Sequence, residues 1–348
     1  MGRKGKLPAS PPPAGKGSGQ RVDQPVVWRD GVHVTGTAIW CDARRARELC
    51  FVSRADRVAG SRHGQLIATT ESFALMGRKR AGTDSELAVP LGRPFSLGTL
   101  RLELFGSGSA LGAAALAIDL GERRVVYAGA IHPRGGGLGG AAEQRACDVL
   151  VVSAHHGAAR YRFPPLDDAA GEIAAECARA RAAGGAAVLL VPGWLEGLDL
   201  AAALERAGAA GLVAHRSIHH AAQRLRAAGQ VDVAVRRAAA HPRAGQVVLW
   251  PLARRGALAA AALPAGSRVL LISGDAVDPV AVSRARADGG VAWSTEADHA
   301  ALCRYIDESR ARAVYLVGRH ADSLAAELDR PGRSARPLAA PQQMSLFG

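Results

Sequence analysis

An apolar run at residues 49–52 leads into the segment Phe51-Val52-Ser53-Arg54-Ala55-Asp56-Arg57-Val58-Ala59-Gly60. Such a short apolar run is typical of a buried strand, so we expect a strand to end here and a charged loop to follow. The loop carries its charges on Arg54, Asp56 and Arg57, and no histidine follows before His63. A metal centre at this strand end would therefore lack histidine, the commonest metal ligand.

The size and charge of the chain allow a globular protein with a polyanionic partner. Its 348 residues can bury a sizeable core in one large or two medium domains. The net charge of +13 favours nucleic acid as a partner. A basic chain from a GC-rich genome without such a partner is the alternative interpretation of the same charge.

The cysteines and the termini indicate a cytoplasmic chain. The five cysteines form no CxxC pair, which favours reduced thiols over disulfides or a zinc ribbon. No apolar stretch is long enough to span a bilayer, so no membrane partner is expected. Residues 1–25 are basic and rich in Pro and Gly, which predicts a disordered tail and not a secretory signal.

The pattern of elements changes along the chain. Residues 26–152 are mostly strand-like, with strands predicted at 32–39, 50–53, 65–69, 100–105, 114–120 and 124–128 and a helix at 71–80. After residue 165, predicted helices at 168–183, 198–207 and 219–228 alternate with strands at 186–191 and 211–214, which is typical of a parallel sheet. Strands and helices between 246 and 327 follow, and residues 330–342 predict a linker.

Several segments are similar to motifs of one family. RVVYAGA at 124–130 is similar to RVVYSGD, and GSALG at 108–112 is similar to GHVLG. Segments 40–45 and 62–69 are similar to those that flank an HxHxDH cluster, and segment 161–165 is similar to the one that closes the first half of that fold. The chain thus resembles the metallo-β-lactamase fold with a β-CASP insertion, and in particular bacterial DNA-ligase-associated exonucleases and mRNA 3′-end-processing-type nucleases.

The resemblance implies an α/β fold with a defined division of the chain. Residues 26–165 and 266–329 would form a four-layer αββα metallo-β-lactamase-like domain. Residues 166–265 would form an inserted parallel α/β subdomain of the β-CASP type. Residues 1–25 would be a basic tail, and residues 330–348 a linker that ends in a short peptide motif.

The same resemblance implies that the metal ligands have been lost. In the family, two zinc or manganese ions activate water and neutralise the phosphodiester, held by histidines and carboxylates. The ligand positions fall here on Arg54, Asp56, Val58, Ala59, Ser109, Ala130, Ser153, Glu296 and Gly318. A gapped alignment places Asp56 and Arg57 on the last two HxHxDH positions and still supplies no histidine. We therefore expect no metal, no cofactor and no catalysis of the family type.

A relocated metal site is the alternative, because five histidines lie near the former motifs: His132, His155, His156, His299 and His320. Adjacent histidines in an extended segment point to opposite faces, so we expect His155 and His156 not to share an ion. We find no nucleophile elbow and no phosphate-binding loop that would supply another chemistry.

The chain ends in a second recognisable motif, Gln343-Met344-Ser345-Leu346-Phe347. It is similar to the bacterial sliding-clamp-binding peptide, in which Leu346 and Phe347 would fill an apolar pocket and Gln343 would form a hydrogen bond. The alternative is an apolar terminus that covers the protein's own core.

The sequence thus predicts a non-catalytic accessory factor in DNA repair or nucleic-acid processing, tethered to the sliding clamp. The expected partners are nucleic acid, with DNA favoured over RNA, the clamp, and an active nuclease or a DNA ligase. Arg54 and Arg57 are the candidates for contacts with nucleic acid. The alternatives are an active metal-dependent exonuclease or hydrolase with a relocated site and a purely structural protein-interaction module.

Overall fold

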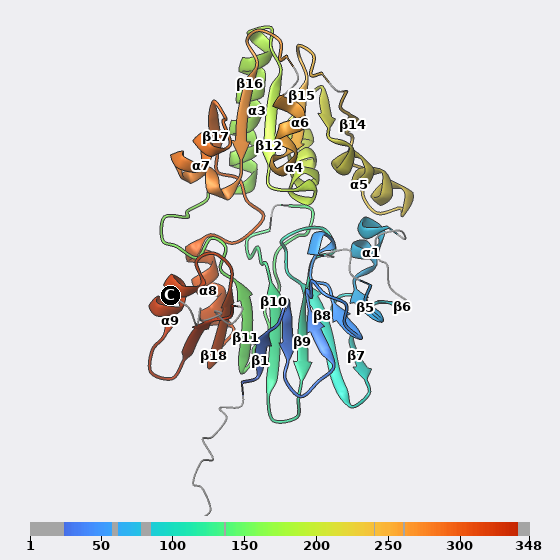
Figure 1. Cartoon of the computed structure of the whole chain (residues 1–348), viewed down its shortest axis with the longest axis vertical. Helices are drawn as coiled ribbons and strands as arrows, with labels where there is room; N and C mark the ends of the chain where they lie inside the picture. Colours follow the sequence, from blue (N-terminus) through green and yellow to red (C-terminus); the bar gives the residue numbers. More distant parts are fainter. Residues whose placement is uncertain are drawn as a thin grey trace, which may run out of the picture.

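The computed structural model describes residues 24–57, 62–77, 85–135, 137–239, 241–259 and 262–339. Three sheets and eight described helices confirm the predicted α/β class. Figure 1 shows two lobes, one above the other. The lower one, residues 24–165 and 292–339, contains two sheets and is called the two-sheet lobe. The upper one, residues 166–291, contains the third sheet and is called the insertion lobe.

The first sheet follows chain order, antiparallel from β1 to β3 and parallel from β3 to β6. The predicted strand at 32–39 is split into two, because the chain turns at Gly36 with a φ of 80° that favours glycine. The strands of this sheet are β1 (Val26–Trp28), β2 (Val32–Val34), β3 (Ile39–Cys41), β4 (Leu49–Phe51), β5 (Gln65–Ala68) and β6 (Ser85–Ala88).

The second sheet has the order β19-β18-β11-β10-β9-β8-β7. Its strands are β7 (Pro94–Leu97), β8 (Leu100–Gly106), β9 (Ala114–Asp119), β10 (Arg124–Gly129), β11 (Val149–Ser153), β18 (Ala313–Val317) and β19 (Ser334–Pro337). β19 pairs in parallel with β18, so residues 334–337 form an edge strand where the sequence predicts a linker. Pro337 is compatible with this position because an edge strand has one side without partners.

The third sheet is entirely parallel, in the order β14-β13-β15-β12-β16-β17. Its strands are β12 (Ala187–Val191), β13 (Leu212–Ala214), β14 (Arg236–Arg237), β15 (Val247–Pro251), β16 (Arg268–Ile272) and β17 (Gly289–Val291). The predicted boundary at residue 265 is too early, because β16 pairs with β12 and β17 pairs with β16. Sequence periodicity could not show this, since a buried strand has the same apolar pattern in either lobe.

Helices cover the outer faces of these sheets. They are α1 (Thr70–Met76), α3 (Leu166–Ala182), α4 (Trp194–Arg206), α5 (Arg216–Ala227), α6 (Arg255–Ala259), α7 (Pro279–Arg284), α8 (His299–Glu308) and α9 (Ala321–Leu328), with 3-10 turns η1 (Ala55–Arg57), η2 (Leu252–Arg254) and η3 (Gly274–Val277). α1 begins one residue before the predicted helix, with Thr69 as its N-cap, and it stops at Gly77. No helix in the described part of the chain is long and apolar enough to cross a membrane.

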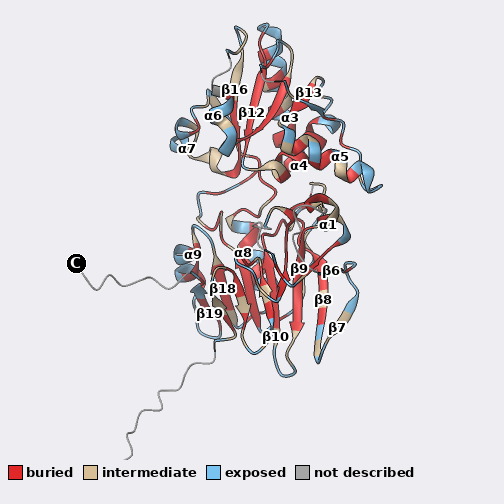
Figure 2. Cartoon of the chain, turned by 45° about the vertical axis from the view of Figure 1, so that its right-hand side comes forward, coloured by how far each residue is buried: buried red, intermediate tan, exposed pale blue. Residues whose placement is uncertain are grey.

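Buried residues are concentrated within both lobes (Figure 2), and apolar cores lie on both faces of each sheet. The first and second sheets pack face to face through residues such as Phe51 and Leu116. The outer face of the second sheet packs against α8 and α9 through Leu302. In the third sheet Leu189 contributes to the core with α3, α4 and α5, whereas Leu190 contributes to the core beside α6 and α7. This alternation explains why β12 is apolar at every position.

Asp298 holds together the two connections between the lobes. Its Oδ2 accepts hydrogen bonds from the Phe163 N–H at 3.2 Å and from the Arg134 guanidinium at 3.0 Å. Its Oδ1 caps α8 by accepting from the Ala301 N–H at 2.9 Å. The outgoing chain near Phe163 and the returning chain at Asp298 are therefore fixed beside each other.

Candidate functional site

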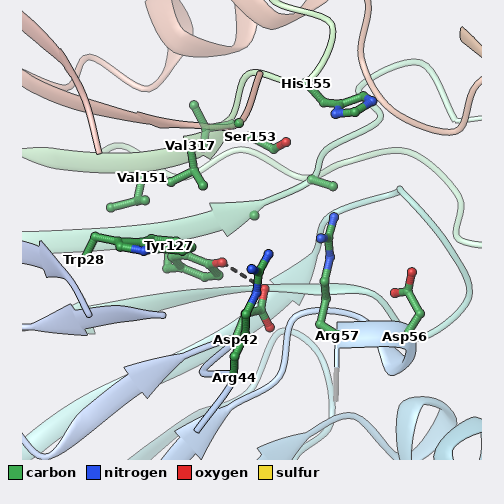
Figure 3. A pocket seen from close by; sticks show the side chains of 14 residues that line it. Trp28, Asp42, Arg44, Asp56, Arg57, Tyr127, Val151, Ser153, His155 and Val317 are labelled. Carbon is green, nitrogen blue, oxygen red and sulfur yellow. Dashed lines mark hydrogen bonds between the residues drawn. The ribbon is translucent and has the colours of Figure 1, made fainter. Parts of the chain in front are cut away.

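A pocket of about 440 Å³ opens where β10, β11 and β18 end and the loops of the first sheet meet the second sheet. Four of the positions expected to have lost a metal ligand line it, namely Asp56, Ala130, Ser153 and Gly318. In Figure 3, Arg57 points toward the side of the pocket where Ser153 and His155 lie. The structure thus brings together residues that lie far apart in the sequence and that the resemblance assigned to one centre.

Arg54 lies next to this pocket and is buried, with 1% of its surface exposed. Its guanidinium donates to both carboxylate oxygens of Asp56, at 3.0 and 2.9 Å. It also donates to Glu296 at 3.3 Å and to Glu196 of α4. We call these four residues the Arg54 cluster. It contains a cation surrounded by carboxylates from three segments of the chain, and one of those segments belongs to the insertion lobe.

The electrostatics of the Arg54 cluster keep Arg54, Asp56 and Glu296 charged. Burial lowers the pKa of the Arg54 guanidinium, but Asp56, Glu196 and Glu296 outweigh burial and hold this pKa well above its usual value. Burial raises the pKa of Asp56 and of Glu296, and the charge of Arg54 reverses both shifts, so each carboxyl has a lowered pKa. Arg54 is therefore compensated inside the protein and does not need an external anion.

The backbone after β4 points Arg54 inward. η1 closes with a hydrogen bond from the Arg57 N–H to the Arg54 carbonyl at 2.9 Å. The preceding residue, Ser53, donates through its N–H and its hydroxyl to Asp42, at 2.8 and 2.5 Å. Asp42 also accepts from the Tyr127 hydroxyl at 2.8 Å (Figure 3).

Sequence reasoning did not identify Asp42 and Tyr127 as parts of the site. Burial, and next the charge of Asp42, raise the pKa of the Tyr127 phenol well above its usual value, so the phenol remains a donor. The sequence signal was an aspartate three residues after the strand predicted at 32–39. In the structure Asp42 directly follows β3, with a φ of 49°. Asp42 fixes the start of the charged loop, and it lines the pocket as well.

Arg57 differs from Arg54 in exposure and in the strength of its pairing. Its side chain is 43% exposed, and its guanidinium lies 3.9 Å from Glu296. Arg54 would have to leave three carboxylates before it could contact a phosphate. The predicted contacts of both residues with nucleic acid stay predictions, and Arg57 has the accessible geometry.

The remaining predicted positions have different surroundings. Ser109 is fully buried, and its hydroxyl lies 3.2 Å from that of Ser107. Val58, Ala59 and the C-terminal motif at 343–347 lie outside the described residues.

His155 and His156 lie closer to one another than their sequence predicts. Their ring centroids are 4.7 Å apart, and each offers a ligand atom within 4.8 Å of the Asp275 carboxylate. The expectation that they face opposite sides is wrong, because the chain turns here and is not extended. Asp275 is already paired with Arg319 through two contacts, at 2.9 and 3.1 Å, which opposes a metal ion at this carboxylate.

Helix α4 supplies a further buried acid, Asp199, which the sequence reasoning also missed. Its Oδ1 accepts from the Leu138 N–H at 2.7 Å, and its Oδ2 has no hydrogen-bond partner. Burial raises the pKa of this carboxyl to about 7. A Cβ at Gly137 would lie 2.9 Å from Oδ1, so this close approach requires glycine. α4 thus contributes Glu196 to the Arg54 cluster and Asp199 to the loop beside it.

The chain is similar to a curated protein and to solved structures, but not to a family model. No family model matches the chain. The chain is 23% identical over 330 residues to the "Probable DNA ligase" of Opitutus terrae, a match that covers 92% of this chain and 32% of that protein. The chain therefore spans about a third of the length of the curated relative that it matches.

A solved structure shares the fold. A protein of unknown function from Enterococcus faecalis V583 superposes with a TM-score of 0.55 at 11% identity, over 84% of this chain and 79% of that chain. At this identity the likeness concerns the fold alone.

Proposed function

We propose that this chain is a DNA-associated accessory protein with a degenerate metallo-β-lactamase/β-CASP architecture that lacks the two-metal centre of that family. The facing first and second sheets, with α8 and α9 on one side and α1 on the other, fit a four-layer αββα arrangement. The insertion between Pro165 and the segment before Asp298 fits a β-CASP subdomain. The free cysteines fit the cytoplasmic location that belongs to this proposal.

The observation that carries the proposal is the Arg54 cluster. Arg54 supplies a permanent positive charge beside the pocket and engages Asp56 and Glu296, which are two of the nine vacated ligand positions. A divalent cation next to Arg54 would meet like-charge repulsion and would compete for the same carboxylates. Ala130 and Gly318 offer no side-chain ligand to replace them.

The association with DNA rests on two supports. One is the match to a protein described as a probable DNA ligase. The other is the net charge of +13, which suits a polyanion. A DNA ligase or an active nuclease as a partner and a tether to the sliding clamp belong to the same proposal.

The proposal is tested by DNA binding and cleavage on one sample of the full chain. Labelled single- and double-stranded DNA is titrated at several salt concentrations, and the same DNA is incubated with the protein in Zn²⁺ or Mn²⁺. We expect no cleavage and an affinity that falls steeply with salt, because phosphate contacts release counterions. Cleavage activity that co-purifies with the protein would contradict the non-catalytic role. Absence of DNA binding would contradict DNA association and favour a protein-interaction module, and an affinity independent of salt would contradict binding through phosphate contacts.

A pair of matched variants locates the binding face. Arg57→Gln removes one charge from the pocket, and Arg45→Gln removes one charge from an ion pair with Asp30 that lies outside the pocket lining. We expect Arg57→Gln to reduce the slope of log affinity against log salt by about 1. Arg45→Gln should leave that slope unchanged. Equal slopes for both variants would place the DNA elsewhere.

A second candidate function, a hydrolase with a relocated metal, is favoured by the grouping of His155, His156 and Asp275 beside the pocket. It predicts cleavage that requires added metal and is lost in His156→Ala. The Arg319 contact with Asp275 is the reason why we rank it second.

A further inference from the structure

Helices α8 and α9 carry a cluster of potential metal ligands away from the pocket. His299 and Cys303 are four residues apart on α8, so both lie on one face of the helix. Glu327 reaches the same place from α9. The two helices lie side by side in the two-sheet lobe in both views (Figures 1 and 2). A ligand atom from each of the three residues lies within 4.8 Å of the other two.

The distances suit a small tetrahedral ion. The His299 Nε2 is 3.8 Å from the Cys303 Sγ and 2.9 Å from the Glu327 Oε2. An ion with zinc-like bond lengths and tetrahedral angles separates a nitrogen and a sulfur ligand by about 3.6 Å, and a nitrogen and an oxygen ligand by about 3.3 Å. Small rotations of the exposed Glu327 side chain would therefore accommodate the ion.

The chemistry and the local charges also favour a cation. Imidazole, thiolate and carboxylate together form a ligand set that suits Zn²⁺ and Co²⁺ more than Mg²⁺ or Ca²⁺. Burial, and next the carboxylates of Glu327 and Asp307, raise the pKa of the Cys303 thiol to about 11, so a cation at this place would offset the negative charge around the sulfur. Cys303 is also the one cysteine of the five that is not buried.

We propose that His299, Cys303 and Glu327 form a binding site for a zinc-type divalent cation that links α8 to α9, with water as the fourth ligand. Binding would release the thiol proton to solvent, because the thiolate is the ligand form. The linked helices pack on the outer face of the second sheet, so the ion would stabilise the two-sheet lobe. This site shares no residue with the vacated positions or with the Arg54 cluster.

The test is a Co²⁺ titration of the chelator-treated full chain under reducing conditions, followed by absorption spectroscopy. We expect a thiolate-to-Co²⁺ charge-transfer band and tetrahedral ligand-field bands that saturate near one ion per chain and disappear on addition of Zn²⁺. Absence of the charge-transfer band in the unmodified protein would overturn the proposal.

Variants assign the band. Cys303→Ser should abolish it, and Glu327→Gln should weaken Co²⁺ binding by at least about tenfold. Glu308→Gln, an exposed glutamate on the same helix α8, is the matched control and should bind normally. A band retained in Cys303→Ser would also overturn the proposal, with circular dichroism confirming that each variant is folded. An ion at His155 and His156 would give no thiolate band, so this result is separate from the hydrolase question. It is equally separate from the DNA-binding result.

Discussion

The buried Arg54 guanidinium and the partly buried Glu196 carboxylate form an ion pair that joins the segment after β4 to the first turn of α4, and so joins the two lobes. The same guanidinium holds Asp56 and Glu296. A buried pair of this kind is costly to break on one side only, because the remaining charges stay desolvated without a partner. Arg54 therefore acts on stability and on the relative placement of the lobes at the same time.

Replacement of Arg54 by methionine should strongly destabilise the protein. It leaves the three partner carboxylates of the Arg54 cluster, which are at most 24% exposed, without their shared cation. We expect a loss of about 3–5 kcal/mol in the free energy of unfolding, measured by urea denaturation. Arg45→Met is the control, since Arg45 is 77% exposed in its pair with Asp30 and should cost less than about 1 kcal/mol. Similar losses for the two variants would rule out a structural role for the Arg54 cluster.

Asp199 gives stability a pH dependence of known sign. Burial raises the pKa of its carboxyl from 3.8 to about 7, against the lowering effect of the Leu138 hydrogen bond. Since the folded pKa is the higher one, the stabilisation is complete below pH 3.8 and is lost as the pH rises through about 7. The buried His132 and His156 act in the opposite direction, because burial lowers the pKa of each to about 4.

The comparison of wild type with Asp199→Asn isolates this carboxyl from the histidines. Asparagine keeps an acceptor for the Leu138 N–H and does not ionise. We expect the stability of wild type relative to the variant to fall on the order of 2 kcal/mol between about pH 5 and about pH 8, measured by denaturation at each pH. A difference that stays constant across this range would show that Asp199 is ionised throughout.

The surroundings of Gly274 and Gly171 predict opposite effects of substitution by alanine on the stability of the protein. A Cβ at Gly274 would lie 2.5 Å from the His156 Nε2 and 2.7 Å from the Phe163 Cζ, so Gly274→Ala should cost about 1–3 kcal/mol by overpacking. Gly171, inside α3, has no atom within 4 Å of its added Cβ. Gly171→Ala should therefore stabilise the protein by about 0.5–1 kcal/mol through helix propensity. Thermal unfolding of both variants tests the pair, and destabilisation by Gly171→Ala would contradict the open environment there.

The C-terminal motif predicts a specific loss of binding. The Leu346→Ala, Phe347→Ala double variant should abolish binding to an immobilised bacterial sliding clamp, because these two side chains would supply the apolar anchors. Pro341→Ala, outside the five-residue motif, is the control and should bind as wild type does. Clamp affinity retained in the double variant would show that the motif does not carry the binding, and no binding by the unmodified chain would remove the clamp as an expected partner.

Much of the secondary structure follows from local sequence patterns. The apolar runs at β10 and β12 predict their strands, and alternation with helices predicts the parallel third sheet. The sequence did not show which strands pair with one another or to which sheet each strand belongs. β16 has the same kind of apolar run as β18, yet the two strands belong to different lobes. β19 was hidden by its proline and arginine content, because its strand geometry comes from pairing with β18.

The sequence by itself determined the α/β class and the absence of histidine between Arg54 and Gly60, since strand periodicity and residue identity are local properties. The resemblance also assigned Ala130 and Gly318, whose side chains offer no ligand atom, to two of the former ligand positions, and the structure shows that both line the pocket. Only the tertiary structure decided what Arg54 contacts, because Glu196 lies 142 residues away and Glu296 lies 242 residues away. Those contacts depend on how the two lobes pack and on which charged side chains lose their hydration when they are buried. Local sequence patterns do not contain that information.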